Sequence, residues 1–423
     1  MESTLGPFDV ATGLVVLAAF FGYLNHRFFG LPQTTALTIM GAVASIAVIA
    51  IDEALPSVNG HHPIRSLIEG IDFRYALMEG MLSFLLFAGA LHVDLNALKR
   101  SRLAIGIITL FGVLLSTAVI GGGAWLIAMA TRFPLPITWC LLFGALISPT
   151  DPVAVMGILK SAKVPPDLEA TVAGESLFND GIGIVVFSIL LGVVANTGEV
   201  SAFDAGKLFA LEALGGAAFG GVAGWIAFLA LRSINEHNLE VLITLALVMG
   251  GYALSHRLHV NGPIAMAVAG LLIGNHGRQH AMSETTRDYV TKFWSLIDDM
   301  LNAVLFLLIG IEVILVLKDV SLLLFGLAAV PLILVARAVS VGLPMLALRN
   351  LSPLSQGAYP ILVLGGVRGG ISIALALSVP AGPYKEVVVA ATYTAVLFSV
   401  LLQAPAVGIA ARRLFANPPV KDS

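Results

Sequence analysis

Long apolar stretches follow one another along almost the whole chain, separated by short polar or proline- and glycine-rich segments. A transmembrane helix needs roughly 20 apolar residues to cross the hydrocarbon of a bilayer. The stretches are continuous over that length, without the alternation over about 10 residues that is typical of a transmembrane β-strand. The pattern predicts an all-α polytopic membrane protein with thirteen spans, at about 8–24, 33–51, 75–94, 103–130, 136–160, 169–196, 206–231, 239–258, 262–276, 289–317, 321–347, 354–380 and 386–412.

Two segments between or after the spans are polar. The segment 61–74 is too rich in charged residues and histidines to cross a bilayer, and we expect it to lie on the membrane surface. Only ten residues follow Arg413. We therefore expect one membrane domain over 1–423 without a soluble C-terminal domain, and we expect the function to reside in the membrane part.

The composition supports this interpretation and excludes several other classes of protein. The chain has 423 residues, of which 58% are hydrophobic and 12% charged, whereas soluble domains are about one quarter charged. The net charge of −3 and the single cysteine, Cys140, exclude a nucleic-acid-binding protein and an internal disulfide scaffold.

The basic residues between the spans predict the orientation of the chain. With the N-terminus outside, the loops on the cytoplasmic side carry 14 Lys and Arg residues and the opposite loops carry 7. Basic residues are enriched in cytoplasmic loops, so we expect a plasma-membrane protein with its N-terminus outside and its C-terminus in the cytoplasm. The two remaining arginines, Arg337 and Arg368, lie inside spans.

The fifth span contains two prolines that bracket Thr150 and Asp151 near its middle. Proline removes a helical hydrogen bond and disfavours the helical conformation of the residue before it, so Pro149 and Pro152 predict a break rather than a bend. An aspartate followed by proline is also a good start for a new helix. We therefore expect two half-helices with Asp151 at their junction.

The twelfth span has a second interruption, where four glycines surround Arg368. Gly366 and Gly369 are the inner pair of these glycines, and such a sequence unwinds a helix. Interrupted helices at corresponding places in two halves indicate a transporter with inverted repeats and a binding site at the midplane. The two breaks are seven spans apart, and we expect them to cross there.

The sixth span carries Glu175 and Asp180 within the membrane, where each charge costs about 2.5 to 3.5 kcal/mol on insertion scales. Glu175 shares a helical face with Asn179, and Ser176 shares an adjacent face with Asp180. The two acids are five residues apart, so about 140° separates them, and we expect different roles for them.

Oxygen ligands that suit a hard monovalent cation are available from Asp180, Asp151, Ser176 and Thr150. A buried carboxylate of this kind can hold a proton or a cation but not both, which is the chemistry of an exchanger. Glu175 instead resembles the partner of a buried arginine, with Arg337 as the first candidate and Arg368 as the second.

Several strings of residues resemble the sodium/proton exchanger family, and in particular its NhaP-like bacterial members. The resemblance covers essentially the whole membrane chain. The strings are SPTDPVAV at 148–155, GESLFNDG at 174–181, FWSLIDD at 293–299, LLIGIE at 307–312 and GVRGGIS at 366–372.

The resemblance implies a thirteen-helix antiporter with inverted six-helix repeats, which forms a homodimer and works by an elevator movement. It implies that the core consists mainly of spans 3–6 and 10–13 and that the dimerisation part consists mainly of spans 1, 2 and 7–9. Asp180 corresponds to the carboxylate that binds cation and proton in turn, and Glu175 to the glutamate of a buried ion pair. Asn179 before Asp180 resembles the electroneutral branch of the family, which implies one proton per cation.

The chain departs from many relatives at one position. LLFAGAL at 85–91 has Ala88 where those relatives carry an acid, which leaves the number of ligands and the choice among Na⁺, Li⁺ and K⁺ open.

The expected partners are monovalent cations, protons, membrane lipid and a second copy of the chain, and no cofactor is expected. The alternatives are a K⁺-selective antiporter and a passive monovalent cation channel. An intramembrane aspartyl protease would need a Gly-x-Gly-Asp string, which the sequence lacks. The glycine-rich ATP-binding loop of a primary pump is also missing from it.

Overall fold

The computed structural model describes residues 7–54, 81–95, 102–131, 135–162, 164–195, 202–312, 320–348 and 357–415. These residues form helices joined by short turns and include no β-strand. Eight of the described helices are long and apolar enough to cross a bilayer, and three shorter apolar helices accompany them. The all-α membrane class is thereby confirmed, whereas the count of thirteen spans stays a prediction. The surface segment expected at 61–74 and the first residues of the third predicted span lie outside the described residues.

The helices follow the predicted spans closely. The first half of the chain forms α1 (Pro7–Leu24), the π-helical turn η1 (Asn25–Phe29), α2 (Gln33–Ala54), α5 (Leu82–Leu91), α7 (Arg102–Ala130), α8 (Ile137–Ile147), α9 (Val153–Ser161) and α10 (Pro166–Ala195). The second half forms α11 (Ala202–Arg232), α12 (His237–Arg257), α13 (Gly262–Leu272), η3 (Ile273–Gly277), α14 (Arg278–His280), α15 (Glu284–Ile311), α17 (Val320–Leu348), α18 (Ala358–Leu364), α19 (Gly370–Ser378), α20 (Lys385–Phe398), η4 (Ser399–Gln403) and α21 (Ala404–Phe415).

Both predicted interruptions are present. The fifth predicted span is divided into α8 and α9, and the twelfth into α18 and α19. The thirteenth predicted span, 386–412, is present as one continuous helical segment, Lys385–Phe415, in which the π-helical turn η4 lies between α20 and α21.

Side-chain caps explain where several helices begin. The first N–H groups of a helix have no partner within it, and a preceding polar side chain commonly accepts one of them. Asn261 accepts the N–H of Ile264 at the start of α13, and Ser283 accepts the N–H of Thr286 at the start of α15. These caps place the helix ends in short polar turns between apolar spans.

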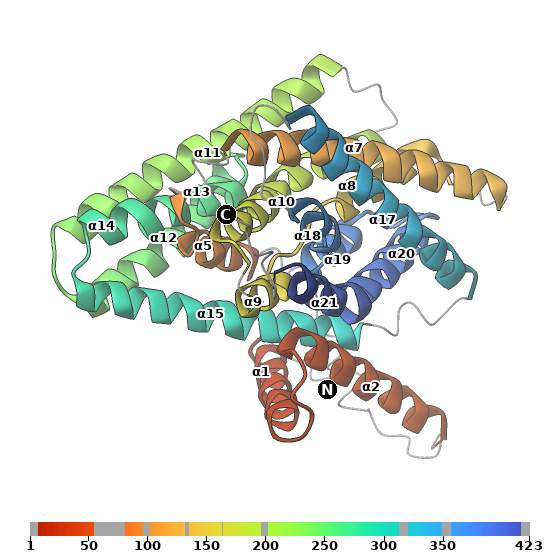
Figure 1. Ribbon diagram of the computed structural model, residues 1–423, viewed down its shortest axis with the longest axis horizontal. Helices are drawn as coiled ribbons and strands as arrows, with labels where there is room; N and C mark the ends of the chain where they lie inside the picture. The colour runs from red at the N-terminus through yellow and green to blue at the C-terminus, as the bar shows by residue number, and fades with distance from the viewer. Residues whose placement is uncertain are drawn as a thin grey trace, which may run out of the picture.

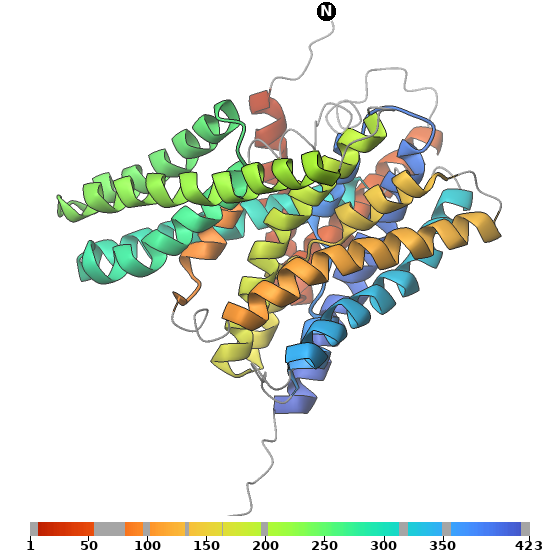
Figure 2. The same ribbon diagram turned by 90° about the horizontal axis from the view of Figure 1, so that it is seen from above.

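The helices pack into two groups (Figure 1). The first group, which we call the α7 group, comprises α7–α10 and α17–α21. Within it, α7 packs against α8, α10 and α17, and α17 packs against α20. The second group, which we call the α15 group, comprises α1, α2, α5 and α11–α15. Within it, α15 packs against α2 and α5, and α13 packs against α5, α11 and α12. Seen from above, α7 and α17 again lie side by side, as do α11 and α13 (Figure 2).

α2 and α15 approach each other very closely. A Cβ atom on Gly41 of α2 would lie 2.7 Å from the carbonyl oxygen of Leu307 in α15. The Thr38 hydroxyl of α2 donates a 3.1 Å hydrogen bond to the carbonyl oxygen of Phe306. Small residues and hydroxyl bonds between helices are typical of tight packing in membranes, so α2 and α15 form one unit.

Candidate functional site

The break in the fifth predicted span is a short non-helical segment, 148–152, between α8 and α9. The Asp151 carboxylate accepts a 2.9 Å hydrogen bond from the backbone N–H of Val153, which is the first residue of α9. The Asp-Pro start that the sequence predicts for the second half-helix is therefore present. Asp151 lies at the junction of the two half-helices, and its backbone is not part of either helix.

The second break, 365–369, lies directly against the first. The backbone N–H of Asp151 donates a 2.7 Å hydrogen bond to the carbonyl oxygen of Val367. Arg368 donates from Nη1 to the carbonyl oxygens of Ser148 and Pro149, the latter at 2.9 Å. A cation at the C-terminal end of a half-helix is stabilised by the helix dipole, and Arg368 occupies that position for α8. Each break therefore supplies hydrogen-bond partners for the other.

Glycine is required where the breaks meet and where α10 approaches them. A Cβ atom on Gly369 would collide with the Asp151 carboxylate. A Cβ atom on Gly183 of α10 would lie 2.5 Å from the ring of Pro149. The absence of side chains at these two positions lets α19 and α10 close around the first break.

Side chains from α10 hold Thr150. The Asn179 amide donates a 2.7 Å hydrogen bond to the Thr150 hydroxyl and accepts a 3.2 Å one from its backbone N–H. Ser176 lies 3.1 Å from the same hydroxyl, oxygen to oxygen. All three side chains are buried. The structure thus brings together the hydroxyl and amide groups that the sequence singles out.

Glu175 forms a buried ion pair with Arg337 of α17. Nη1 and Nη2 of the arginine each donate a 2.8 Å hydrogen bond to one carboxylate oxygen, and Asn179 donates a third, at 3.0 Å. The Nε atom of Arg337 donates to the carbonyl oxygen of Leu362 in α18, at 3.1 Å. The sequence offers two arginines as partners of Glu175. The structure pairs Glu175 with Arg337, whereas Arg368 donates hydrogen bonds to the first break.

Asp180 differs from these groups because one of its carboxylate oxygens lacks a hydrogen-bond donor in the described part of the chain. Its side chain is only 3% exposed, yet its Oδ1 atom accepts no hydrogen bond from the residues that the structure describes. The charges of Asp151, Glu175 and Arg368 act on it. A buried carboxylate oxygen without a donor is costly unless a proton or a cation satisfies it, and Asp180 is therefore the group in this site that is free to bind one.

The oxygens around the breaks come from carboxylate, hydroxyl and amide groups. Within the described ranges there is no group of three His, Cys, Asp or Glu side chains that could hold a metal ion. Hard cations prefer oxygen ligands, and the mixed set of Asp180, Asp151, Thr150 and Ser176 matches that preference.

An open cavity of about 490 Å³ lies between the two groups of helices. Its walls come from α2 and α15 on one side and from α9 and α21 on the other, and Val153 at the start of α9 is among them. Asp299 and Asn302 of α15 also line it, and Asn302 donates a 3.1 Å hydrogen bond to Asp298. The cavity therefore extends toward the first break and carries an acid on its wall.

Two features of this region are not anticipated by the sequence analysis. Ala88 is fully buried in an apolar cluster with Phe87, Met266 and Trp294, so this position is part of apolar packing. Gln403 of η4 donates a 2.8 Å hydrogen bond to the carbonyl oxygen of Leu364, at the end of α18. The signal for Gln403 was available, because it is the only side-chain amide in the stretch 386–412.

Comparisons with known proteins show which family the chain resembles over its length. The family model for the transmembrane part of sodium/hydrogen exchangers matches residues 15–413. The chain is 45% identical over 421 residues to the Na⁺/H⁺ antiporter NhaP of Pseudomonas aeruginosa, covering 98% of this chain and 99% of that protein. It is 30% identical over 383 residues to the Na⁺/H⁺ antiporter NhaH of Halobacillus dabanensis, covering 88% of this chain and 89% of the relative.

A solved structure shares the fold. The sodium proton antiporter MjNhaP1 of Methanocaldococcus jannaschii, at pH 8, matches with a TM-score of 0.74 and 20% sequence identity over 97% of this chain and 99% of that chain.

Proposed function

The chain belongs to the sodium/hydrogen exchanger family, and from this membership and the geometry of the site we propose that it is a secondary antiporter that exchanges Na⁺ for H⁺. It is then a transporter rather than an enzyme, and the cation and the proton are its substrates. The observation that carries the proposal is the unsatisfied carboxylate oxygen of Asp180, which is buried beside two crossing helix breaks.

In this proposal Asp180 binds the cation and the proton in turn. Thr150, Ser176 and Asp151 supply further oxygens, and Asn179 holds Thr150 in place through two hydrogen bonds. A proton on Asp180 removes the negative charge that attracts the cation, and a bound cation occupies the position of the proton. Because the two ligands exclude each other at one group, their movements in opposite directions are coupled.

Access to the site alternates, in our proposal, through movement of the α7 group against the α15 group. Two features support this: the breaks and Asp180 belong to the α7 group, and the open cavity is walled by one group on each side. The α15 group then contains the dimerisation surface of a homodimer. This division places α5 and α15, which are spans 3 and 10, with α2 and α13, because those helices pack together; the sequence analysis assigns these two spans to the core, and the boundary between spans 6 and 7 is the same in both.

We propose a one-to-one exchange that moves no net charge. Asn179 stands next to Asp180 where a second aspartate would add a negative charge, and its amide is fully used by Thr150 and Glu175. Li⁺ and K⁺ are alternative cations, since ligand oxygens alone do not distinguish among alkali ions. A passive cation channel is the alternative of a different class.

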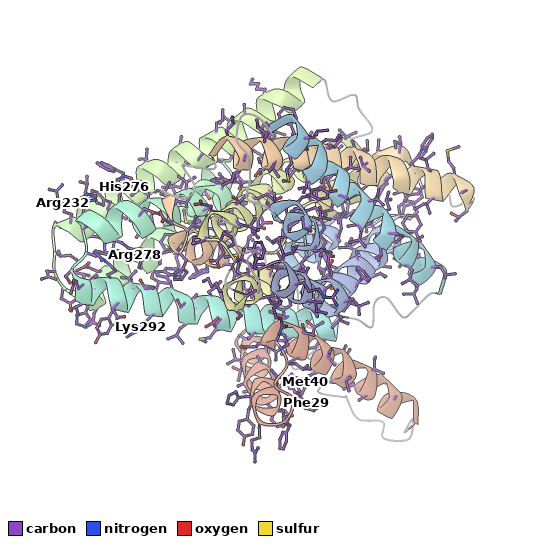
Figure 3. All side chains as sticks on the ribbon, in the orientation of Figure 1. Phe29, Met40, Arg232, His276, Arg278 and Lys292 are labelled. Atoms are coloured by element: carbon purple, nitrogen blue, oxygen red, sulfur yellow. The ribbon has the colours of Figure 1, made fainter. Side chains whose placement is uncertain are left out.

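The protein is an integral membrane protein, and we propose that its N-terminus is outside and its C-terminus in the cytoplasm. Arg232 at the end of α11, Arg278 at the start of α14 and Lys292 in the first half of α15 lie toward the same end of the molecule (Figure 3). Clustered basic residues favour the cytoplasmic side, which agrees with the orientation expected from the loops.

Proton movement in proteoliposomes tests the proposal. Purified protein is reconstituted with a pH-sensitive dye inside an acidified lumen, and NaCl, LiCl, KCl or choline chloride is added outside. Exchange predicts dequenching with Na⁺ but not with choline. A channel predicts Na⁺ conductance without obligatory proton counterflow, and that result would contradict the proposal.

A further inference from the structure

The C-terminal end of α18 borders the second break, and its carbonyl groups are fully accounted for. The last four carbonyl groups of a helix have no partner within it. In α18 two of the four accept hydrogen bonds from the backbone N–H groups of the glycines that follow. The other two accept from side chains: Leu362 from Arg337 at 3.1 Å, and Leu364 from Gln403 at 2.8 Å.

Gln403 is held in a fixed orientation by the turn that carries it. It is the last residue of the π-helical turn η4, and such turns commonly mark functional sites. Its Nε2 atom donates to Leu364, while its Oε1 atom accepts a 3.0 Å hydrogen bond from the Ser399 hydroxyl. The side chains of Gln403 and Ser399 are both buried. Since both the nitrogen and the oxygen of the amide are hydrogen-bonded, the Gln403 side chain has one fixed orientation and links η4 to the end of α18.

The carbonyl that Gln403 holds is close along the chain to the contact between the two breaks. Leu364 is three residues before Val367, and the carbonyl oxygen of Val367 accepts the N–H of Asp151. The two residues between them, Gly365 and Gly366, donate backbone hydrogen bonds to the carbonyl groups of Ile361 and Val363, so this segment is bonded to the end of α18. A shift of Leu364 is therefore passed to Val367 and to Asp151, next to the carboxylate that we propose to bind the cation.

The donors at the two half-helix ends differ in charge. Arg368 donates to the end of α8, whereas the end of α18 receives one hydrogen bond from Arg337, whose charge is paired with Glu175, and one from the neutral amide of Gln403. A neutral donor satisfies the carbonyl without adding a positive charge that would compete with the transported cation for the nearby carboxylates. The choice of glutamine is thus compatible with cation binding a few residues away.

We propose that Gln403 is a positioning residue for cation binding, which holds the end of α18 so that the second break keeps Asp151 in place. This inference rests on the proposed exchange function, and it assigns to η4 a role in setting the affinity for the cation.

The test compares three variants in the proteoliposome assay. Gln403→Met keeps the length of the side chain but donates no hydrogen bond, and Gln403→Leu removes both the donor and the acceptor of the amide. The matched control is Thr392→Val in α20, which removes an equally buried hydroxyl whose 2.7 Å bond stays within its own helix. We expect both Gln403 variants to raise the apparent KM for Na⁺ about tenfold, with Vmax changed much less, and Thr392→Val to leave KM within about twofold.

Two results would overturn the positioning role. One is a KM for Na⁺ in Gln403→Met that equals the wild-type value, and the other is an equal rise of KM in Thr392→Val. If Gln403→Met does not accumulate in membranes, Gln403→Leu decides by the same criterion.

Hydrogen–deuterium exchange separates this inference from the exchange function itself. Without Na⁺, the amides of 365–370 and of Asp151 should exchange several-fold faster in Gln403→Met than in the wild type or in Thr392→Val. Unchanged protection of these amides would refute the positioning role of Gln403, whether or not the protein moves protons. Faster amide exchange in a protein whose wild type lacks Na⁺-dependent proton movement would instead count against the proposed function alone.

Discussion

The backbone N–H of Asp151 donates a 2.7 Å hydrogen bond to the carbonyl oxygen of Val367, so the two helix breaks are bonded to each other through their main chains. Unpaired backbone groups within a membrane are tolerated only where protein or a polar cavity satisfies them. Here each break satisfies part of the other, and Asp151 and Arg368 of the two breaks act electrostatically on the buried carboxylate of Asp180.

Asp180→Asn should abolish Na⁺-dependent proton movement while the protein still folds. The amide has nearly the shape of the carboxylate but neither takes up a proton nor attracts a cation. The matched control is Asp288→Asn on α15, whose 2.7 Å pair with Lys292 is exposed and contributes little. Dye dequenching on addition of NaCl measures both variants. Wild-type rates in Asp180→Asn would show that the binding group is elsewhere.

Glu175→Ala should destabilise the protein more than it weakens cation binding. Removing one partner of a buried ion pair leaves the other charge uncompensated, which costs about 3–5 kcal/mol. The double variant Glu175→Gln, Arg337→Met should regain part of the lost stability, because no buried charge then remains in the pair. Thermal unfolding in detergent measures the three proteins. A stable Glu175→Ala with altered ion selectivity would mean that Glu175 acts as a ligand.

The sequence predicts both breaks because prolines and glycines act locally on the backbone. It also places Glu175 and Asn179 on one helical face, and in the structure they are bonded at 3.0 Å. Spacing within one helix does not determine which distant arginine faces Glu175, since that depends on how α17 packs against α10. The turn η4 was missed although Pro405, two residues after it, cannot donate the helical hydrogen bond to the carbonyl group of Leu401 within the turn. The contacts of η4 with Leu364 and Thr35 on other helices depend on packing and could not be predicted from spacing.

Exchange should be insensitive to an imposed membrane potential. If one proton moves for each Na⁺, no net charge crosses the bilayer, and a potential does no work on the cycle. Proteoliposomes with a K⁺ gradient and valinomycin should give the same initial rate of dequenching at positive, zero and negative potential. The control is an otherwise identical preparation without valinomycin. Clear stimulation by one sign of the potential would require unequal numbers of charges.

Introduced cysteines should show that the cavity opens to the cytoplasm. The native Cys140 is fully buried and is the only cysteine of the chain, so it leaves a low background. Ser161→Cys and Ala303→Cys lie on the cavity wall and should react with a membrane-impermeant maleimide in everted vesicles but not in right-side-out vesicles. Val248→Cys, at a fully buried position, should stay unlabelled in both. The opposite sidedness would reverse the orientation that we propose.

Gly369→Ala should impair exchange although alanine fits the backbone there. The residue has φ −130° and ψ −157°, which any L-residue adopts, so the cost arises from space alone. The added methyl group would collide with the Asp151 carboxylate and displace it from the crossing. A displacement of about 1 Å can cost on the order of a hundredfold in rate, and we expect the exchange rate to fall by tenfold or more on that basis.

Gly192→Ala provides the matched control for this prediction. Gly192 lies in α10, and a Cβ atom there would meet nothing within 4 Å, so its exchange rate should stay at the wild-type value. Both variants are measured by Na⁺-dependent dequenching at equal protein content, with thermal unfolding as the measure of folding. Because Gly369 and Asp151 belong to different breaks, a rate loss confined to Gly369→Ala would mean that the crossing must stay closed around Asp151. Equal rates in both variants would mean that the breaks can separate without cost to transport.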